Sequence, residues 1–284
     1  MINRKYYSIR TGKNPSAEKY DLQTLLKLFK SVYAQFEQKN YFQEALGYIC
    51  VDAGEIQGFL GRDIEAIIIR KIRKPNLWPV LTSCMEYTED DLFDVIEFLF
   101  DNISYPVEGY YHDYSDCGWH YKIFDKVKGQ EEFRTEVNEL LRDYQEGYEL
   151  SEEGEILALA DNGLEPLLSA PILPIDPQNV DMRIEAAKKK FRRHRSSFED
   201  RRDAIRDLAD VFEFLRPKLA DVLDNKDEND LFNIANNFAI RHHNEKQKQN
   251  YDKGIWYSWM FYFYLATIHA VTRLIEKKKE NNNS

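Results

Sequence analysis

The chain has 284 residues, 43% of them hydrophobic and 14% aromatic, which excludes an intrinsically disordered protein although 31% of the residues are charged. The length favours two domains over one. The net charge of −10 is concentrated in residues 86–161, with 5 Lys/Arg against 22 Asp/Glu; residues 1–85 carry 13 against 8 and residues 162–284 carry 21 against 19. The acidic total therefore does not exclude a nucleic-acid partner.

The first half of the chain is predicted to be mainly helical. Apolar side chains recur at helical spacing over residues 20–38, and residues 50–61 are Gly-rich and predict a turn or loop. Asp63 and Glu65 then open a helix whose basic end precedes Pro75. Further along, the sequence predicts a capping box at Thr88 and Asp91 that starts a helix over residues 88–104, a helix over 131–145 and a small β-hairpin over 147–159.

The second half is predicted to be a helical bundle. Three prolines within seven residues, from Pro171 to Pro177, predict a linker. Helical patterns follow over residues 179–195, 198–223, 228–242 and 253–279, and their short connections favour an antiparallel four-helix bundle. The predicted fold class is mainly α, with domains at residues 1–170 and 179–284 joined by a Pro-rich linker at 171–178.

We expect a cytoplasmic protein that does not enter a membrane. Residues 255–275 are apolar enough to suggest a tail anchor. On a helix, however, a narrow polar stripe interrupts this segment, which lipid would penalise; it consists of Ser258, Tyr262, His269, Arg273 and Glu276. The opening residues lack the apolar core of a signal peptide, and the three widely spaced cysteines fit a reducing compartment.

The stretch Arg241-His242-His243-Asn244 is the first candidate site. It follows an apolar helical pattern, with Asn237 one turn earlier. One interpretation is a helix end whose cations are stabilised by the helix dipole. The other is a phosphate site, in which arginine binds phosphate oxygens and histidine transfers protons. Such a pair would cleave RNA without a metal, by removing the 2′-hydroxyl proton or protonating the leaving 5′-oxygen.

Two further stretches carry reactive or charged residues. His112, Cys117 and His120 are zinc-ligand types, with Cys50 or Cys84 as the possible fourth ligand, but the paired CxxC signature is absent, so we predict no metal and keep zinc as an alternative. This segment has two other interpretations: a turn at Gly118 with aromatic side chains packed beneath it, or a pocket that senses a ligand. Residues 188–195 hold six strong cations, including Lys189, Arg192 and Arg193, which we predict to contact RNA. The other interpretation of this run is a solvated helix face, with the nearby Glu185, Glu199 and Asp200 reducing its charge.

Familiar enzyme motifs are missing from the sequence. It contains no Gly-rich phosphate loop, no GxSxG and no HExxH. These gaps weigh against a built-in ATPase and against conventional hydrolases.

Several phrases carry a resemblance to known families. "RRDAIRDLADVFEFLR", "LFNIANNFAIRHHNEKQKQNYD" and "IWYSWMFYFYLATIH" resemble the HEPN superfamily of small helical bundles. "YFQEALGYICVDAG", "LFDVIEFLFDNIS", "CGWHYKIFD" and "GYELSEEGEI" resemble the N-terminal domain of AbiJ-like abortive-infection proteins. Together the phrases span most of residues 40–275.

The resemblance implies a phage-defence protein with a metal-independent ribonuclease domain that works as a homodimer through its C-terminal bundle. Carried over to this chain, it makes Arg241 the phosphate ligand and His243 the acid or base, assisted by His242. Asn244 and Asn237 would then position the RNA. The HEPN motif has four to six residues between Arg and His, whereas His follows Arg241 directly. Either the nearer histidine serves, or the bundle is a non-catalytic sensor or adaptor. Asp210 and Glu213 are predicted partners of the arginine, or members of ordinary salt bridges. We predict no cofactor, and the trigger, whether phage-derived or a nucleotide, stays open.

Overall fold

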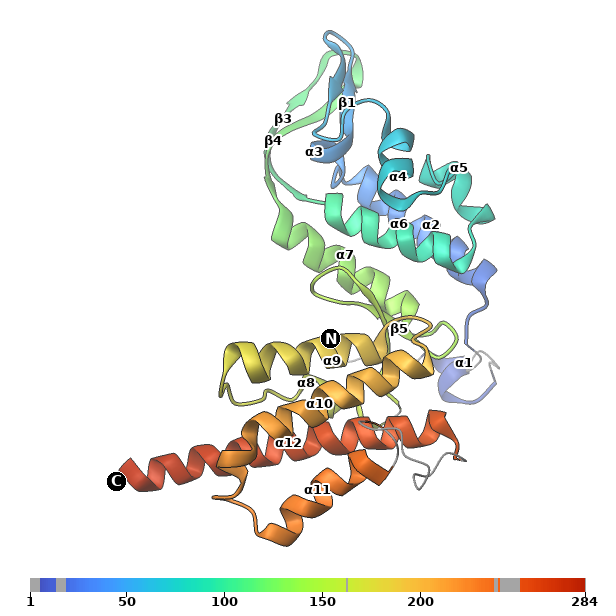
Figure 1. Cartoon of the computed structure of the whole chain (residues 1–284). Coiled ribbons are helices and arrows are strands. Elements are labelled where there is room, and N and C mark those ends of the chain that lie inside the picture. Colours follow the sequence, from blue (N-terminus) through green and yellow to red (C-terminus); the bar gives the residue numbers. More distant parts are fainter. Residues whose placement is uncertain (1–5, 14–18, 162, 238–239, 241–250, 284) are drawn as a thin grey trace. The chain divides into compact units, whose positions relative to one another are not determined.

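A computed structural model describes residues 6–13, 19–161, 163–237, 240 and 251–283. These residues are mainly helical and include three two-stranded antiparallel hairpins (Figure 1). The predicted mainly α fold class is therefore confirmed. The chain divides into two compact units, residues 1–157 and residues 158–284.

The first unit is built around three long helices whose apolar faces form its core. These are α2 (Leu22–Gln38), α6 (Glu89–Asn102) and α7 (Lys126–Leu141), and α7 contacts the other two. The shorter elements are α1 (Tyr7–Arg10), α3 (Gln43–Leu46), α4 (Ile64–Ile72), α5 (Val80–Ser83) and the 3₁₀ turns η1 (Cys84–Glu86) and η2 (Tyr114–Asp116). The apolar positions predicted for α6 are all buried, which confirms its period: Leu92, Phe93, Val95, Ile96, Leu99 and Phe100.

Side-chain caps start two helices of the first unit: the capping box at Thr88 and Asp91 was predicted, whereas Asp63, predicted in the first turn of a helix, is the N-cap residue before that turn. Asp63 caps α4, because its Oδ1 accepts a hydrogen bond from the Ala66 N–H at 2.9 Å. Thr88 and Asp91 form a complete capping box at the start of α6. Lys74 contributes a charge there, with Nζ 3.0 Å from Asp91 Oδ1. Local sequence chemistry thus fixes where these helices begin.

The hairpins of the first unit differ in how far they were predictable. The hairpin of β5 (Tyr148–Leu150) and β6 (Ile156–Ala158) confirms the prediction for residues 147–159. Two hairpins were not predicted: β1 (Gly47–Cys50) with β2 (Gly54–Gln57), and β3 (Tyr105–His112) with β4 (Gly118–Asp125). These two lie side by side (Figure 1), and the Gln43 side chain bridges to β4 by donating to the Trp119 carbonyl and accepting from the Tyr121 N–H.

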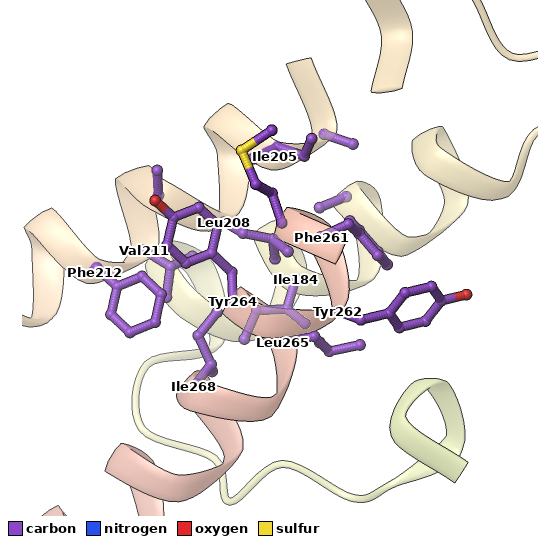
Figure 2. Close-up of a cluster of buried hydrophobic side chains, with 14 of the residues drawn as sticks. Ile184, Ile205, Leu208, Val211, Phe212, Phe261, Tyr262, Tyr264, Leu265 and Ile268 are labelled. Carbon is purple, nitrogen blue, oxygen red and sulfur yellow. The ribbon is translucent and has the colours of Figure 1, made fainter. Parts of the chain in front are cut away.

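The second unit packs its helices around α10 (Phe198–Leu219). That helix contacts α9 (Met182–Arg192), α11 (Asn225–Asn237) and α12 (Lys253–Asn283). Figure 2 shows part of the shared core, with Ile184, Leu208 and Phe261 among the labelled side chains. Phe261 of α12 stacks on Phe191 of α9, with ring centroids 4.0 Å apart. A short helix α8 (Glu165–Ser169) and a π-turn η3 (Pro177–Asp181) precede α9.

Residues 158–178 belong to this second unit. Leu164, Leu168, Ile172 and Ile175 pack against its core, so the segment predicted as a linker lies within a compact unit. On α12 the predicted polar stripe makes contacts, because the Asp161 N–H donates to the Tyr262 hydroxyl at 3.4 Å. Among the described helices, none combines the length and apolar character needed to cross a membrane.

Candidate functional site

The predicted catalytic stretch lies outside the described residues. Arg241, His242, His243 and Asn244 all fall in the segment 241–250, which the structure does not describe. Asn237 is the last residue of α11, but the structure does not describe its side chain. The roles assigned to these residues therefore stay predictions.

The residue just before this stretch is described and is held in the core of the second unit. Ile240 is fully buried, and its carbonyl oxygen accepts a hydrogen bond from Arg206 Nε at 3.2 Å. Arg206 also pairs through Nη1 with Asp203 Oδ1 at 3.2 Å. Ile240 is thus held beside the N-terminal half of α10.

That half of α10 belongs to a strongly basic helix hairpin. Residues 188–206, which span the end of α9, a short connection and the start of α10, hold nine Lys and Arg against three Asp and Glu, a net charge of +6. Arg201 lies over the Phe191 ring, with its guanidinium carbon 5.4 Å from the ring centroid. The excess of positive charge is suited to a phosphate backbone.

The three predicted RNA-contacting cations differ in their surroundings. Arg193, the C-cap residue that follows α9, is exposed. Lys189 and Arg192 are half-buried, and Arg192 Nε donates to the Ala158 carbonyl at 2.8 Å. Arg193 is therefore the best placed of the three to meet a ligand from solvent.

Other charges near this hairpin are partly neutralised within the unit. Lys188 is buried and pairs with Glu185 at 2.8 Å, and Lys190 pairs with Asp207 of α10. Glu213, a predicted partner of Arg241, lies 3.4 Å from Arg216 in an ordinary salt bridge. The sequence count of six cations in residues 188–195 thus overstates what the hairpin presents to a ligand.

The histidine and cysteine candidates come together at the ends of the two unpredicted hairpins. Cys50 ends β1, His112 ends β3, Cys117 closes the β3–β4 turn, and His120 lies on β4. One ligand atom from each of the four residues lies within 4.8 Å of every other. Cys50 Sγ is 3.7 Å from His112 Nδ1, and Cys117 Sγ is 3.3 Å from His120 Nε2.

Each histidine has a second polar partner on its other ring nitrogen. His112 Nε2 is 3.2 Å from Asp52 Oδ2, and His120 Nδ1 is 3.1 Å from the Tyr110 hydroxyl oxygen. Burial, with a smaller contribution from the His112 ring, lowers the pKa of His120. Its ring is therefore neutral near pH 7, the form with a lone pair to share.

The third cysteine lies elsewhere in the first unit. Cys84 is fully buried beside α2, with Sγ 3.5 Å from the Leu26 carbonyl oxygen. Burial raises the pKa of its thiol to about 11. Of the two alternatives for the fourth ligand, the fold therefore selects Cys50. Cys50 itself could not be chosen from the sequence, because 61 residues separate it from His112.

Comparison with protein-family models, curated proteins and solved structures finds no match for this chain. The resemblance to HEPN and AbiJ-like proteins thus rests on the sequence phrases alone.

Proposed function

We propose that this protein is a phage-defence ribonuclease whose C-terminal helical unit is a HEPN-like bundle that cleaves RNA without a metal. The first unit would sense the trigger or regulate the second. The proposal combines the chemistry of the Arg241–Asn244 stretch with the resemblance of the surrounding sequence. No comparison with known proteins contributes to it.

The observation that carries the proposal is the hydrogen bond from Arg206 to the Ile240 carbonyl. It anchors the residue before Arg241 on the basic helix hairpin of residues 188–206, whose net charge of +6 becomes +4 when the ion-pair partners Glu185 and Asp207 are counted. A phosphate bound at Arg241 would then benefit from the surrounding positive potential. A helix-capping role for Arg241 and the histidines would not require this basic neighbour.

In the proposed reaction Arg241 binds a non-bridging phosphate oxygen and stabilises the charge that builds up on the pentacoordinate phosphorus. His243 removes the 2′-hydroxyl proton or protonates the leaving 5′-oxygen. His242 and Asn244, with Asn237, position the nucleotide. Arg193, Arg192 and Lys189 contact the flanking RNA backbone.

An apolar stripe on α12 supports the proposed homodimer; it is exposed at Ile255 and Trp259 and half-buried against the core at Phe263. Ile255, Trp259 and Phe263 follow one another at four-residue spacing, and the exposed fractions of Ile255 and Trp259 are 68% and 43%. Trp259 stacks on Phe263 with ring centroids 5.3 Å apart. Large aromatic side chains of this kind are enriched in protein interfaces. A second copy on this stripe would bring two Arg241–Asn244 stretches into one assembly.

A cleavage assay tests the proposal. Full-length protein is mixed with total RNA or tRNA in buffer without divalent ions, and Arg241→Ala and His243→Gln are compared with wild type. We expect the two substitutions to lower the rate by about 10²–10⁴-fold. The matched controls, Arg273→Ala and His269→Gln on α12, should keep the wild-type rate.

The alternative is a non-catalytic adaptor, which the same apolar stripe on α12 favours because it would serve any partner protein. Light scattering separates the two functions when it is combined with the cleavage assay. A stable dimer with no cleavage of either RNA would support the adaptor and contradict the ribonuclease. Equal cleavage by wild type, Arg241→Ala and His243→Gln would also contradict the proposed ribonuclease site.

A further inference from the structure

We propose that the first unit binds one structural Zn²⁺ ion through Cys50, His112, Cys117 and His120. The inference does not rest on the proposed ribonuclease, because all four residues lie in the first compact unit. It replaces our sequence prediction of no metal with the zinc alternative.

The distances among the four side chains match the needs of a tetrahedral ion. With Zn–S of about 2.3 Å and Zn–N of about 2.0 Å, a tetrahedral zinc holds sulfur and nitrogen ligands roughly 3.5 Å apart. The two sulfur–nitrogen distances in the structure, 3.7 Å for Cys50–His112 and 3.3 Å for Cys117–His120, lie on either side of that value. All pairs are within 4.8 Å, so small rotations of the side chains would close the site.

The second nitrogen of each ring is arranged as in a ligand histidine. If His112 binds through Nδ1, its Nε2–H donates to Asp52; if His120 binds through Nε2, its Nδ1–H donates to the Tyr110 hydroxyl. Metal-binding histidines almost always make such a bond, which fixes the tautomer and the ring orientation. The nitrogens that face the cysteines, His112 Nδ1 and His120 Nε2, are the ones that remain available to bind the metal.

The ligand set favours zinc and a structural role. Two thiolates and two imidazoles suit Zn²⁺ and not Mg²⁺ or Ca²⁺, which prefer oxygen ligands. Four protein ligands fill a tetrahedral shell, whereas catalytic zinc sites keep one position for water or substrate. Two of the ligands, Cys50 and His120, are also buried. On binding, the two thiols give up their protons to solvent and the thiolates neutralise the charge of the ion.

The ion would join two hairpins that are small when taken alone. The strands β1 and β2 have four residues each, and an isolated hairpin of this size is marginally stable at best. The β1–β2 hairpin already contacts β4 through the Tyr48 ring, whose centroid is 4.4 Å from that of the ligand His120. The ligands span residues 50–120, so the ion would close a long loop of the chain, which favours the folded state.

A disulfide between Cys50 and Cys117 is the competing use of the same sulfurs. It would leave His112 and His120 without a shared ion. If the disulfide forms, Cys84 is the one thiol that a thiol reagent can modify after unfolding without a reductant. If the protein binds zinc instead, all three cysteines are free thiols and react after unfolding. Thiol titration in denaturant therefore separates the two states.

Metal analysis of the full-length protein is the main test. The protein is purified under reducing conditions from cells grown with zinc and dialysed against metal-free buffer. Its zinc content is then measured by inductively coupled plasma mass spectrometry. We expect one zinc per chain in wild type and in Cys84→Ala, the control that removes a thiol outside the site. Cys117→Ser and His120→Gln should lose the zinc.

Two readouts keep the test decisive if a ligand variant fails to fold. Wild-type protein loaded with Co²⁺ should show the visible bands of a tetrahedral ion and thiolate charge transfer in the near ultraviolet. Asp52→Asn, in a positioning residue whose side chain is 61% exposed, should weaken zinc binding about 10-fold in competition with a chelator. Wild type that holds no zinc and binds neither ion from solution, or that shows one reactive thiol instead of three, would overturn the proposal.

Discussion

Replacing Glu97 by glutamine should change the free energy of unfolding in a direction that follows from the surroundings of the Glu97 carboxyl. Its side chain on α6 accepts a hydrogen bond from the Ile156 N–H at 2.8 Å. Burial raises the pKa of the carboxyl, the bond from Ile156 opposes this, and the charges of Asp94, Glu155 and Asp101 raise it further. The ionised side chain is therefore a net cost to the folded first unit.

Glutamine at position 97 removes the charge and keeps an acceptor oxygen for Ile156. It stands in for the protonated carboxyl, so the expected gain at pH 7 is about 1.4 kcal/mol for each unit by which folding raises the pKa. Glu97 is half-buried, and we expect a gain on the order of 1 kcal/mol. A loss would result if the charge of Glu97 strengthened its bond to Ile156 by more than burial costs.

The gain depends on pH in a defined direction. Between the ordinary value of 4.5 and the raised folded pKa, the folded protein binds more protons than the unfolded chain. Wild-type stability therefore falls as the pH rises through the folded pKa, while Glu97→Gln lacks this titration. The difference between the two proteins therefore grows as the pH rises above 4.5 through the folded pKa, and it disappears below pH 4.5.

Urea denaturation with a probe confined to the first unit measures the effect. Replacing Trp256 and Trp259 by Phe leaves Trp78 and Trp119, both in the first unit, to report unfolding by fluorescence. Glu139→Gln, on an exposed position of α7, is the control and should change stability by less than about 0.5 kcal/mol. A lower urea midpoint for the Glu97 variant at pH 7, or an equal gain at pH 4 and pH 7, would refute the reasoning.

Three further predictions concern the cores, a helix cap and the metal. Phe261→Ala removes a fully buried ring and should lower the unfolding free energy of the second unit by about 3–5 kcal/mol in urea denaturation. The control Phe214→Ala, at an exposed position of α10, should lower it by less than about 1 kcal/mol. Thr88→Ala should cost the first unit about 1 kcal/mol at pH 7. Although burial opposes it, hydrogen bonds from Thr88 and Lys74 lower the pKa of Asp91, so this cost should shrink in denaturation at a pH below that pKa. Chelating the proposed zinc should lower the melting temperature of the first unit alone in calorimetry, and a shift of both transitions would contradict the site assignment.

The long helices could be predicted because their signals are local. In α6 one capping box and one apolar face specify both the start and the buried side, and the structure reproduces both. Helix α2 likewise starts where Asp21 caps it, with Oδ1 accepting from the Thr24 N–H at 2.8 Å. Each of these features depends on residues within a few positions of one another.

The two unpredicted hairpins lack such a local signal. Strand β3 does not alternate buried and exposed residues, and its pairing with β4 shifts register around Glu108. The strand needs Gly109 there, because a Cβ at this position would lie 2.5 Å from the His120 carbonyl oxygen. The grouping of Cys50 with Cys117 requires the β1–β2 hairpin to lie beside the β3–β4 hairpin, so a spacing rule based on neighbouring cysteines does not detect it.

The ends of the RNA fragments test the central claim most directly. Wild-type protein is incubated with tRNA without divalent ions, its zinc content is measured in parallel, and the 5′ ends of the products are identified. Attack by the 2′-hydroxyl, with Arg241 and His243 in the proposed roles, leaves 5′-hydroxyl ends. The account predicts these ends alone, and none with His243→Gln. Fragments with 5′-phosphate ends, or intact tRNA after incubation with the zinc-loaded dimer, would contradict it.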